Sequence, residues 1–182
     1  MKQWMIVGAI IVVLVGAYLW NRSRNTDNTQ ETIPPVEEII TQEDGSVVRK
    51  TGDTIQPLSD EEIEAKKKEI NEHLANQQIK PLAAVGGQTG SGTTASTFSD
   101  GTYYQKIMVS NLAALQKGYY YEAWLQKDDG THVSIGRLQM TDGNGELYYS
   151  SKDDKTGYSQ TIITREVEDG NKEMGAEKVL QG

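Results

Sequence analysis

The feature that most constrains this chain is an uncharged apolar run near its start. Residues 4–20 read WMIVGAIIVVLVGAYLW, seventeen positions without a charge or a strongly polar group. A helix of this length measures about 25 Å, slightly less than a hydrocarbon core of about 30 Å. Trp4 and Trp20 stand at its two ends, where an indole suits the boundary between lipid and water. Residues 1–24 therefore predict a transmembrane anchor, with the lipid bilayer as a partner and both tryptophans at the membrane interfaces.

Two other interpretations compete with a membrane span. A buried core helix needs apolar partners, and only 36% of the chain is hydrophobic. A cleaved signal peptide needs small residues before the polar boundary, but this run ends in AYLW. We therefore expect an uncleaved single span. The flanking charges, Lys2 before it and Arg22 and Arg24 after it, leave its orientation open.

The polar stretch after the anchor has a structural signature only in its second part. Residues 25–57 are acidic and predict a flexible segment, with a lone hairpin around residues 39–48 as the alternative. Residues 58–80 predict a charged amphipathic helix, because Ser59 and Glu62 have the spacing of a capping box. The apolar stripe of this helix is thin. We expect a solvated stalk helix, with self-association through residues 58–78 as a possible use of the stripe.

A shift in composition follows the helix. Residues 86–101 read GGQTGSGTTASTFSDG, with twelve Gly, Ser or Thr among sixteen positions. Such a composition is typical of a flexible coil. Residues 81–101 are therefore predicted to be a linker that marks a domain boundary.

Short strand-like runs alternate with turn residues after the linker. The candidate strands are 103–110, 119–127, 132–140, 146–151, 161–167 and 177–180. Asp-Gly and Asn-Gly turns separate several of them, as in antiparallel sheets. The predicted fold class is mainly β: a small antiparallel β-sandwich over 102–182, preceded by a transmembrane helix, a polar stalk and one amphipathic helix.

An aromatic cluster, GYYYEAWLQ, lies in the second of these strands. Side chains alternate along a strand, so Tyr121 and Leu125 share one face while Tyr120 and Trp124 share the other. With aromatic residues on both faces, we expect a central strand whose rings fill a core poor in Leu and Phe. The alternative is an exposed aromatic surface, with Tyr120, Tyr148 and Tyr149 as its members.

The same region resembles a known family. The order YEAWL, SIGRL, GELYY, TRE, DG and VLQG over residues 111–182 is similar to the C-terminal domain of anti-sigma-K factors. The motif residues that would form the family core are Tyr121, Trp124, Leu125, Gly136, Leu138, Thr164, Glu166, Val179 and Leu180. A proline typical of the family near its end is replaced here around residues 172–175.

The resemblance implies an extracytoplasmic β-sandwich behind one membrane span, with the N-terminus cytoplasmic and the C-terminal domain outside. The family's zinc-containing domain, which captures the sigma factor, has no counterpart in this sequence. We therefore expect a membrane-anchored domain that binds or senses an unknown protein or envelope ligand. It would take part in regulating sigma factor activity but would not sequester a sigma factor alone. The alternative is a structural envelope protein with a self-associating helical stalk.

Few residues here are suited to catalysis or metal binding. The chain has no cysteine and two histidines, His73 and His132, neither beside a recognisable triad. Acidic loops such as 142–146 lack the spacing of a calcium loop and are more simply hairpin turns. A net charge of −8 without a basic stripe argues against nucleic acid as a partner. We expect no enzyme activity, no metal and no cofactor.

Overall fold

Strands dominate the computed structural model, which describes residues 36–42 and 46–182. The strands are β1 Glu37–Thr41, β2 Val47–Thr51, β3 Thr54–Pro57, β4 Lys80–Ala84, β5 Ser91–Ser99, β6 Thr102–Ser110, β7 Tyr119–Gln126, β8 His132–Arg137, β9 Gln139–Thr141, β10 Asn144–Ser151, β11 Gln160–Val167 and β12 Lys178–Gln181. The helix, α2, spans Asp60–Leu74. Within the described ranges no helix is long and apolar enough to cross a membrane. The predicted anchor, with Trp4 and Trp20, lies outside these ranges and stays a prediction.

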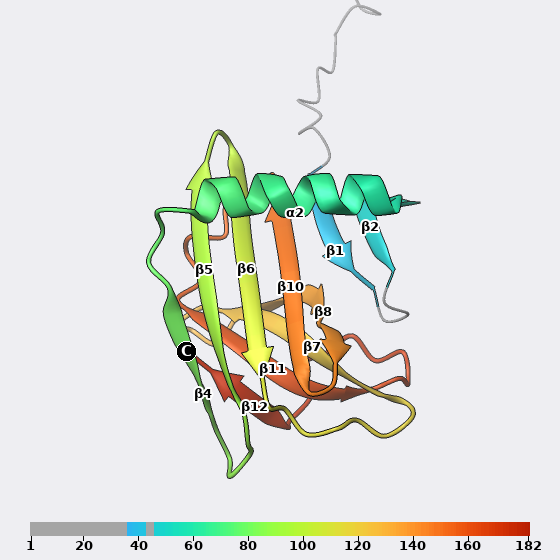
Figure 1. Ribbon diagram of the computed structural model, residues 1–182, viewed down its shortest axis with the longest axis vertical. Helices are drawn as coiled ribbons and strands as arrows, with labels where there is room; N and C mark the ends of the chain where they lie inside the picture. The colour runs from blue at the N-terminus through green and yellow to red at the C-terminus, as the bar shows by residue number, and fades with distance from the viewer. Residues whose placement is uncertain (1–35, 43–45) are drawn as a thin grey trace, which may run out of the picture. The chain divides into compact units, whose positions relative to one another are not determined.

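All the strands belong to one antiparallel sheet. Its order is β3-β2-β1-β10-β6-β5-β4-β12-β11-β7-β8, and β9 pairs with β10 beside this path. In Figure 1 the strands β5, β6 and β10 stand in front of β7, β8 and β11, so the sheet folds back over itself. The predicted mainly β, antiparallel class is confirmed. The two separate sheets of a sandwich are replaced by one continuous sheet.

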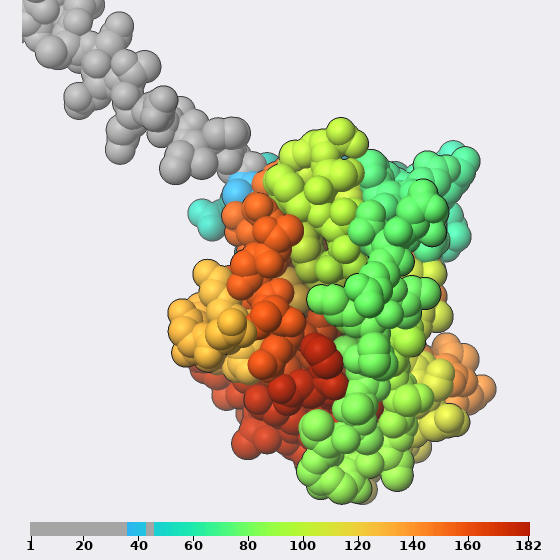
Figure 2. All heavy atoms as spheres, turned by 90° about the vertical axis from the view of Figure 1, so that its left-hand side faces the viewer, coloured from blue at the N-terminus to red at the C-terminus, as the bar shows by residue number. Residues whose placement is uncertain are grey.

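The joint between the front and back strands depends on segments far apart in sequence. Leu180 of β12 pairs with Ala84 of β4, and β4 in turn pairs with β5. Figure 2, viewed from this side, shows the green surface of β4 and β5 beside the red surface of the C-terminal strand. The last residues of the chain therefore complete the sheet instead of extending from it.

The main core lies on the inner face of the folded sheet. Its buried residues are Leu82, Tyr103, Ile107, Val109, Leu112, Tyr121, Ala123, Leu125, Ile135, Leu138, Leu147, Tyr149, Ile163, Val179 and Leu180. Tyrosines contribute much of its volume, and the rings of Tyr103 and Tyr149 meet edge to face at 6.2 Å. This arrangement matches the expectation that large rings fill a core poor in phenylalanine.

The segment predicted as a linker, residues 81–101, is wrong as a flexible coil, because it contains most of β4 and all of β5. β5 pairs with β4 on one side and with β6 on the other. A side chain is excluded at Gly92, where an added Cβ would lie 2.8 Å from the Met108 carbonyl oxygen. Thr94 is buried, and its Oγ1 accepts a hydrogen bond from Gln105 Nε2 at 2.9 Å. Glycine and threonine serve here as strand residues that permit close packing and satisfy buried polar groups.

The prediction of a flexible acidic segment over 25–57 is wrong for its described part, since β1, β2 and β3 form there. β1 pairs with β2 and also joins the rest of the sheet through β10. Ile39 and Val48 are buried, with 2% and 1% of their surfaces exposed. The hairpin alternative was the correct one, because a third partner strand supplies the stability that a lone hairpin lacks.

Helix α2 begins as its sequence predicts. Ser59 N–H donates to Glu62 Oε2 at 2.9 Å, and Glu62 N–H donates to Ser59 Oγ at 3.3 Å, which completes the capping box. Ser59 Oγ also donates to Glu62 Oε2 at 3.0 Å, and the bonds from the Ser59 N–H and hydroxyl lower the pKa of the Glu62 carboxyl. The helix ends at Leu74, earlier than the predicted residue 80.

The expectation that the helix is a solvated stalk is wrong. α2 lies across the outer face of β5, β6 and β10 (Figure 1), and Ile70 and Leu74 are buried against Tyr104 of β6. Tyr104 Oη donates to Glu69 Oε1 at 3.1 Å, and Lys67 Nζ donates to Glu146 Oε1 at 2.9 Å. The thin apolar stripe of α2 therefore packs against the sheet of the same chain. Self-association of the chain stays a prediction.

Candidate functional site

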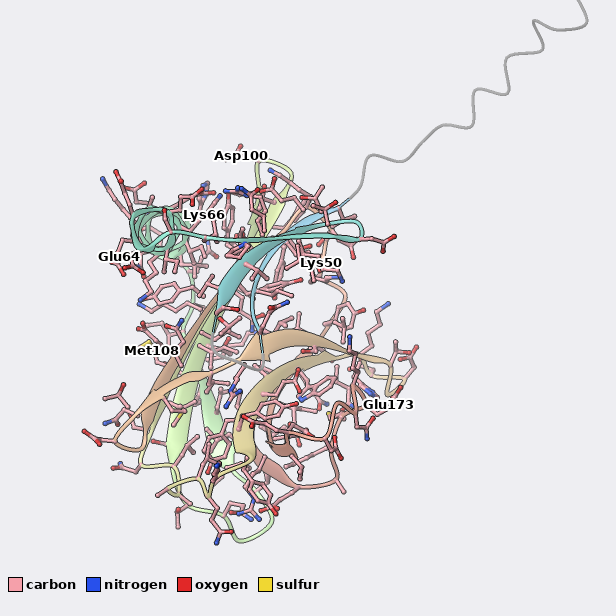
Figure 3. The ribbon with its side chains drawn as sticks, turned by 90° about the vertical axis from the view of Figure 1, so that its right-hand side faces the viewer. Lys50, Glu64, Lys66, Asp100, Met108 and Glu173 are labelled. Atoms are coloured by element: carbon pink, nitrogen blue, oxygen red, sulfur yellow. The ribbon has the colours of Figure 1, made fainter. Side chains whose placement is uncertain are left out.

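A groove of about 660 Å³ opens where the two ends of the sheet approach each other. One wall comes from β1 and β2, the other from β7 and β8, and residues 170–172, after β11, close one side. We call this the β1–β8 groove. Its polar lining residues are Glu38, Thr41, Gln42, Lys50, Tyr120, Glu122, Ser134, Arg137, Asn171 and Lys172. In Figure 3 Lys50, from the β2 wall, and Glu173, next to Lys172, lie on the same side of the molecule.

Gly136 allows β8 to come close to β1. Its φ is +119°, and an added Cβ would lie 3.0 Å from both the N and the O atoms of Thr41. Only glycine accepts this φ and this approach without strain. The β8 strand is also irregular at this point, where its register with β7 shifts between Ala123 and Trp124. The glycine therefore permits the close approach of β8 to the β1 backbone at the groove.

The β7 and β8 wall carries a fixed polar pair. Ser134 Oγ donates to Glu122 Oε1 at 2.5 Å, and Ser134 Oγ in turn accepts a hydrogen bond from Gly136 N–H at 3.3 Å. A carboxylate that accepts such a bond has part of its charge satisfied locally. Glu122 is thus held against its own wall.

Arg137 extends this wall and is held on two sides. Its guanidinium lies 4.7 Å from the centroid of the Tyr120 ring, and Nη2 donates to Glu168 Oε1 at 3.0 Å. A guanidinium has five N–H donors, so one such bond leaves donor capacity for a further anion. Its side chain is 20% exposed. Arg137 is therefore a rigid, partly buried cation at the groove.

The β1 and β2 wall carries one satisfied carboxylate and one cation. Glu38 Oε1 accepts from Tyr149 Oη at 2.9 Å and from Ser151 Oγ at 3.3 Å, and Lys155 Nζ lies 3.9 Å away. Burial, together with the Glu38 charge, raises the pKa of Tyr149, so its phenol stays protonated and donates. Lys50 has no ion-pair partner among the described residues.

Residues 168–177 bring a third cation to the groove. Lys172 is exposed and, within the described part of the chain, makes no salt bridge. A hydrogen bond ties this segment to β11, because Glu166 Oε1 accepts from Gly175 N–H at 2.8 Å. Three cations thus surround a groove whose two carboxylates already accept hydrogen bonds. Such an arrangement suits an anionic ligand.

The family-motif residues predicted from the sequence lie mostly behind the groove. All nine are buried: Tyr121, Trp124, Leu125, Gly136, Leu138, Thr164, Glu166, Val179 and Leu180. Two of them touch the groove directly or through a neighbour. Gly136 lines it, and Glu166 anchors the segment that carries Lys172.

The alternative of an exposed aromatic surface is wrong for two of its three members. Tyr120 and Tyr149 have only 3% and 1% of their surfaces exposed. Tyr148 is half-buried, with Lys67 Nζ and Lys106 Nζ at 5.5 Å and 5.1 Å from its ring centroid. Tyr120 lines the groove, Tyr149 lies in the main core and Tyr148 packs beside α2, so these three rings do not form an exposed stacking surface.

The three groove cations could not be predicted from the sequence, for a physical reason. Lys50 and Lys172 lie in stretches without periodic signal, and only folding brings them near β8. Arg137 stood inside a quoted family motif but was not singled out. His73, for which the sequence shows no recognisable triad, has its Nδ1 2.9 Å from Ser99 Oγ, and its ring stacks on Tyr104. This contact joins α2 to the β5–β6 hairpin.

Titratable clusters elsewhere do not suggest a metal centre. The described residues contain no group of three or more His, Asp or Glu side chains that could hold a metal ion. The His132 ring instead meets Trp124 edge to face at 5.7 Å. The site supported best by geometry and charge is the β1–β8 groove.

Comparison with known families places the chain. The family described as anti-sigma-K factor RskA, C-terminal, matches residues 4–176. The chain belongs to this family. The matched range begins at Trp4, the first residue of the predicted membrane span, and includes the groove. Neither a curated protein nor a solved structure matches the chain.

Proposed function

We propose that this protein regulates sigma factor activity from outside the membrane, by binding a signal in the β1–β8 groove. The membrane span over residues 4–20 anchors it, with the N-terminus in the cytoplasm and the β domain in the extracytoplasmic space. Binding at the groove changes how the anchored chain acts on its regulatory partner. The domain works as a binding module.

The observation that carries this proposal is the family match over residues 4–176. An anti-sigma factor family supports a role in sigma factor regulation. The match extends through the apolar run and the whole groove, which supports their use together in one regulatory chain. The groove adds a binding surface, because its volume of about 660 Å³ lies within the range of small-molecule and cofactor sites, about 300–1,000 Å³.

The regulatory part of the proposal is tested by removing the chain. The gene is deleted from its cell of origin and restored in full length, and RNA is sequenced in all three strains. We expect a set of transcripts that share one promoter class to change on deletion and to return on restoration. If no promoter class responds, the regulatory function is wrong.

The sidedness is tested with single cysteines, because the natural chain has none. Lys68→Cys is placed on α2, where the Lys68 side chain is 78% exposed. Lys2→Cys is the control before the predicted span. A membrane-impermeant maleimide on intact cells should label position 68, and position 2 only after lysis. Labelling of position 2 alone on intact cells would reverse the proposed topology.

A further inference from the structure

We propose that the β1–β8 groove binds an acidic peptide in an extended conformation, laid along the outer edge of β8. The inference rests on the proposed function in one respect, that the groove is the binding site. It adds the chemical class of the partner and the way in which it docks. Three observations carry it: a strand edge, the charges beside it and a contrast with the other end of the sheet.

The strand edge is the outer side of β8. β8 is the last strand in the sheet order, and among the described residues only β7 pairs along it. Just before β8, Lys127 N–H donates to the Thr131 carbonyl at 2.8 Å. Bonded and non-bonded pairs alternate along an antiparallel ladder. The backbone N–H and C=O groups of His132 and Ser134 therefore point away from β7.

This edge runs beside the groove. Val133 and Ser134 line it directly. An incoming extended chain gains backbone hydrogen bonds from such an edge and side-chain contacts from the walls, which is the usual mode of strand addition. At about 3.3 Å per residue, an extended segment of about six residues spans the six residues of β8.

The other end of the sheet is less suited to strand addition. β3 is the terminal strand there, and its ladder places Thr51 opposite Thr54 across the turn. Alternation turns the backbone groups of Ile55 and Pro57 outward, and proline has no N–H to offer. A proline on an edge strand discourages pairing with another chain. The comparison favours β8 as the edge that accepts a peptide.

The charges specify an acidic peptide. Arg137, Lys50 and Lys172 line the groove, while Glu38 and Glu122 already accept hydrogen bonds from hydroxyl groups. A neutral or basic peptide would leave Lys50 and Lys172 without carboxylate partners and would not use the remaining N–H donors of Arg137, which is paired with Glu168. Side chains of an extended peptide alternate in direction, so acidic residues at every second position would all face one wall. Charge complementarity of this kind gives both a faster association and specificity.

The test uses the full-length chain in neutral detergent micelles and a fluorescein-labelled octapeptide of four Glu-Thr repeats. Matched peptides with Gln or Lys in place of Glu are the controls. Fluorescence anisotropy should detect binding of the Glu-Thr peptide, at least about tenfold weaker binding of the Gln-Thr peptide and no binding of the Lys-Thr peptide. Lys50→Gln with Lys172→Gln should weaken Glu-Thr binding about tenfold, whereas Lys68→Gln on α2 should leave it unchanged.

Hydrogen exchange on the same complex reads out the docking mode. Added peptide should slow exchange of the amides at residues 132–134 and leave those of β3 unchanged. Polyphosphate of similar charge serves as a competitor that lacks a backbone. Binding of polyphosphate as tight as that of the peptide, without protection of 132–134, would overturn the peptide assignment in favour of an anionic polymer. Absence of binding by the Glu-Thr peptide would overturn it outright.

Failure of this inference can be told apart from failure of the proposed function. If no transcripts change when the gene is deleted, the regulatory function is contradicted, whether or not the peptide binds. An intact transcript response without peptide binding contradicts only the acidic peptide. The two experiments use different readouts and share no variant.

Discussion

Trp124 and Thr164 are joined by a buried hydrogen bond that links the YEAWL and TRE stretches of the chain. Trp124 Nε1 donates to Thr164 Oγ1 at 2.8 Å, across the pair of strands β7 and β11. Both residues are almost fully buried, at 2% and 0% exposure. The indole N–H and the hydroxyl oxygen satisfy each other, and each would be costly to bury alone.

A double-mutant cycle measures this bond. Thr164→Val keeps the shape but leaves the indole N–H without its acceptor, which should cost about 1–3 kcal/mol in the free energy of unfolding. Trp124→Phe removes the donor and leaves a cavity, so it should also destabilise the fold. The double variant should lose less than the sum of the two, with a coupling of about 1 kcal/mol by urea unfolding. Strictly additive losses would show that the bond contributes nothing.

Gly136→Ala should strain the contact between β8 and β1 at the groove. Alanine at a φ of +119°, with its Cβ 3.0 Å from the Thr41 backbone, should cost about 1–3 kcal/mol. The β1–β2 hairpin should then open locally, which hydrogen exchange of residues 37–51 would show. Gly101→Ala is the control, because its φ is also positive but an added Cβ there meets no atom within 4 Å. Equal exchange of the hairpin in the two variants would contradict the role of Gly136.

The packing of α2 on the sheet is tested by two isoleucines. Ile70 lies on the buried face of α2, against the sheet, whereas Ile79, which follows the helix, is 66% exposed. Ile70→Ala should lower the free energy of unfolding by about 2–5 kcal/mol, and Ile79→Ala by less than about 0.5 kcal/mol. Thermal melts followed by circular dichroism would compare them. Similar melting temperatures for the two variants would mean that the helix is not docked on the sheet.

Acid should weaken the contacts of α2. Hydrogen bonds from Ser59 lower the pKa of Glu62. For Glu69, burial acts to raise the pKa, but Lys66 and Tyr104 outweigh it and the net shift is downward. A folded-state pKa below the ordinary 4.5 gives stabilisation that is complete above pH 4.5 and lost as pH falls through the lower value. The melting temperature should therefore fall as pH drops below 4.5.

Glu62→Gln with Glu69→Gln provides the comparison for the acid series. This variant lacks both carboxylates, so its melting temperature should fall less than that of the natural chain over the same pH range. Scanning calorimetry from pH 7 to pH 3 would follow both proteins. A parallel decline of the two curves would assign the acid sensitivity to other groups.

Local patterns predicted the C-terminal strands well. The candidate strands 103–110, 119–127 and 161–167 coincide within one or two residues with β6, β7 and β11. Each combines β-branched or aromatic residues with a Gly- or Asp-containing turn. The start of α2 was predicted equally well, because a capping box is a local interaction of two side chains with nearby backbone groups.

The segments that were mispredicted depend on distant partners. β5 reads as a linker because Gly, Ser and Thr dominate it, but it is stabilised on both edges by β4 and β6. β1 and β2 read as a flexible segment because their third partner, β10, lies about a hundred residues later. Composition indicates which local conformation the residues prefer, and pairing with strands distant in sequence can override that preference.

The groove could not have been predicted for the same reason. Its cations come from β2, from β8 and from the segment after β11, and the stretches that carry Lys50 and Lys172 have no motif of their own. Gly136 is the exception, since its motif was recognised. Glycine is needed there because the Thr41 backbone lies too close for a side chain, and this contact forms only when β1 lies beside β8 in the fold.

The most direct test of the central claim, that the β1–β8 groove is the regulatory binding site, is sigma-factor-dependent transcription in cells that carry full-length groove variants. Lys50→Gln, Arg137→Gln and Lys172→Gln are combined, and Lys68→Gln on α2 is the matched control. The account predicts that the triple variant alters the regulated transcripts as deletion does, with the fold retained by circular dichroism, while the control behaves like the natural chain. Natural transcript levels in cells carrying a folded triple variant would contradict it.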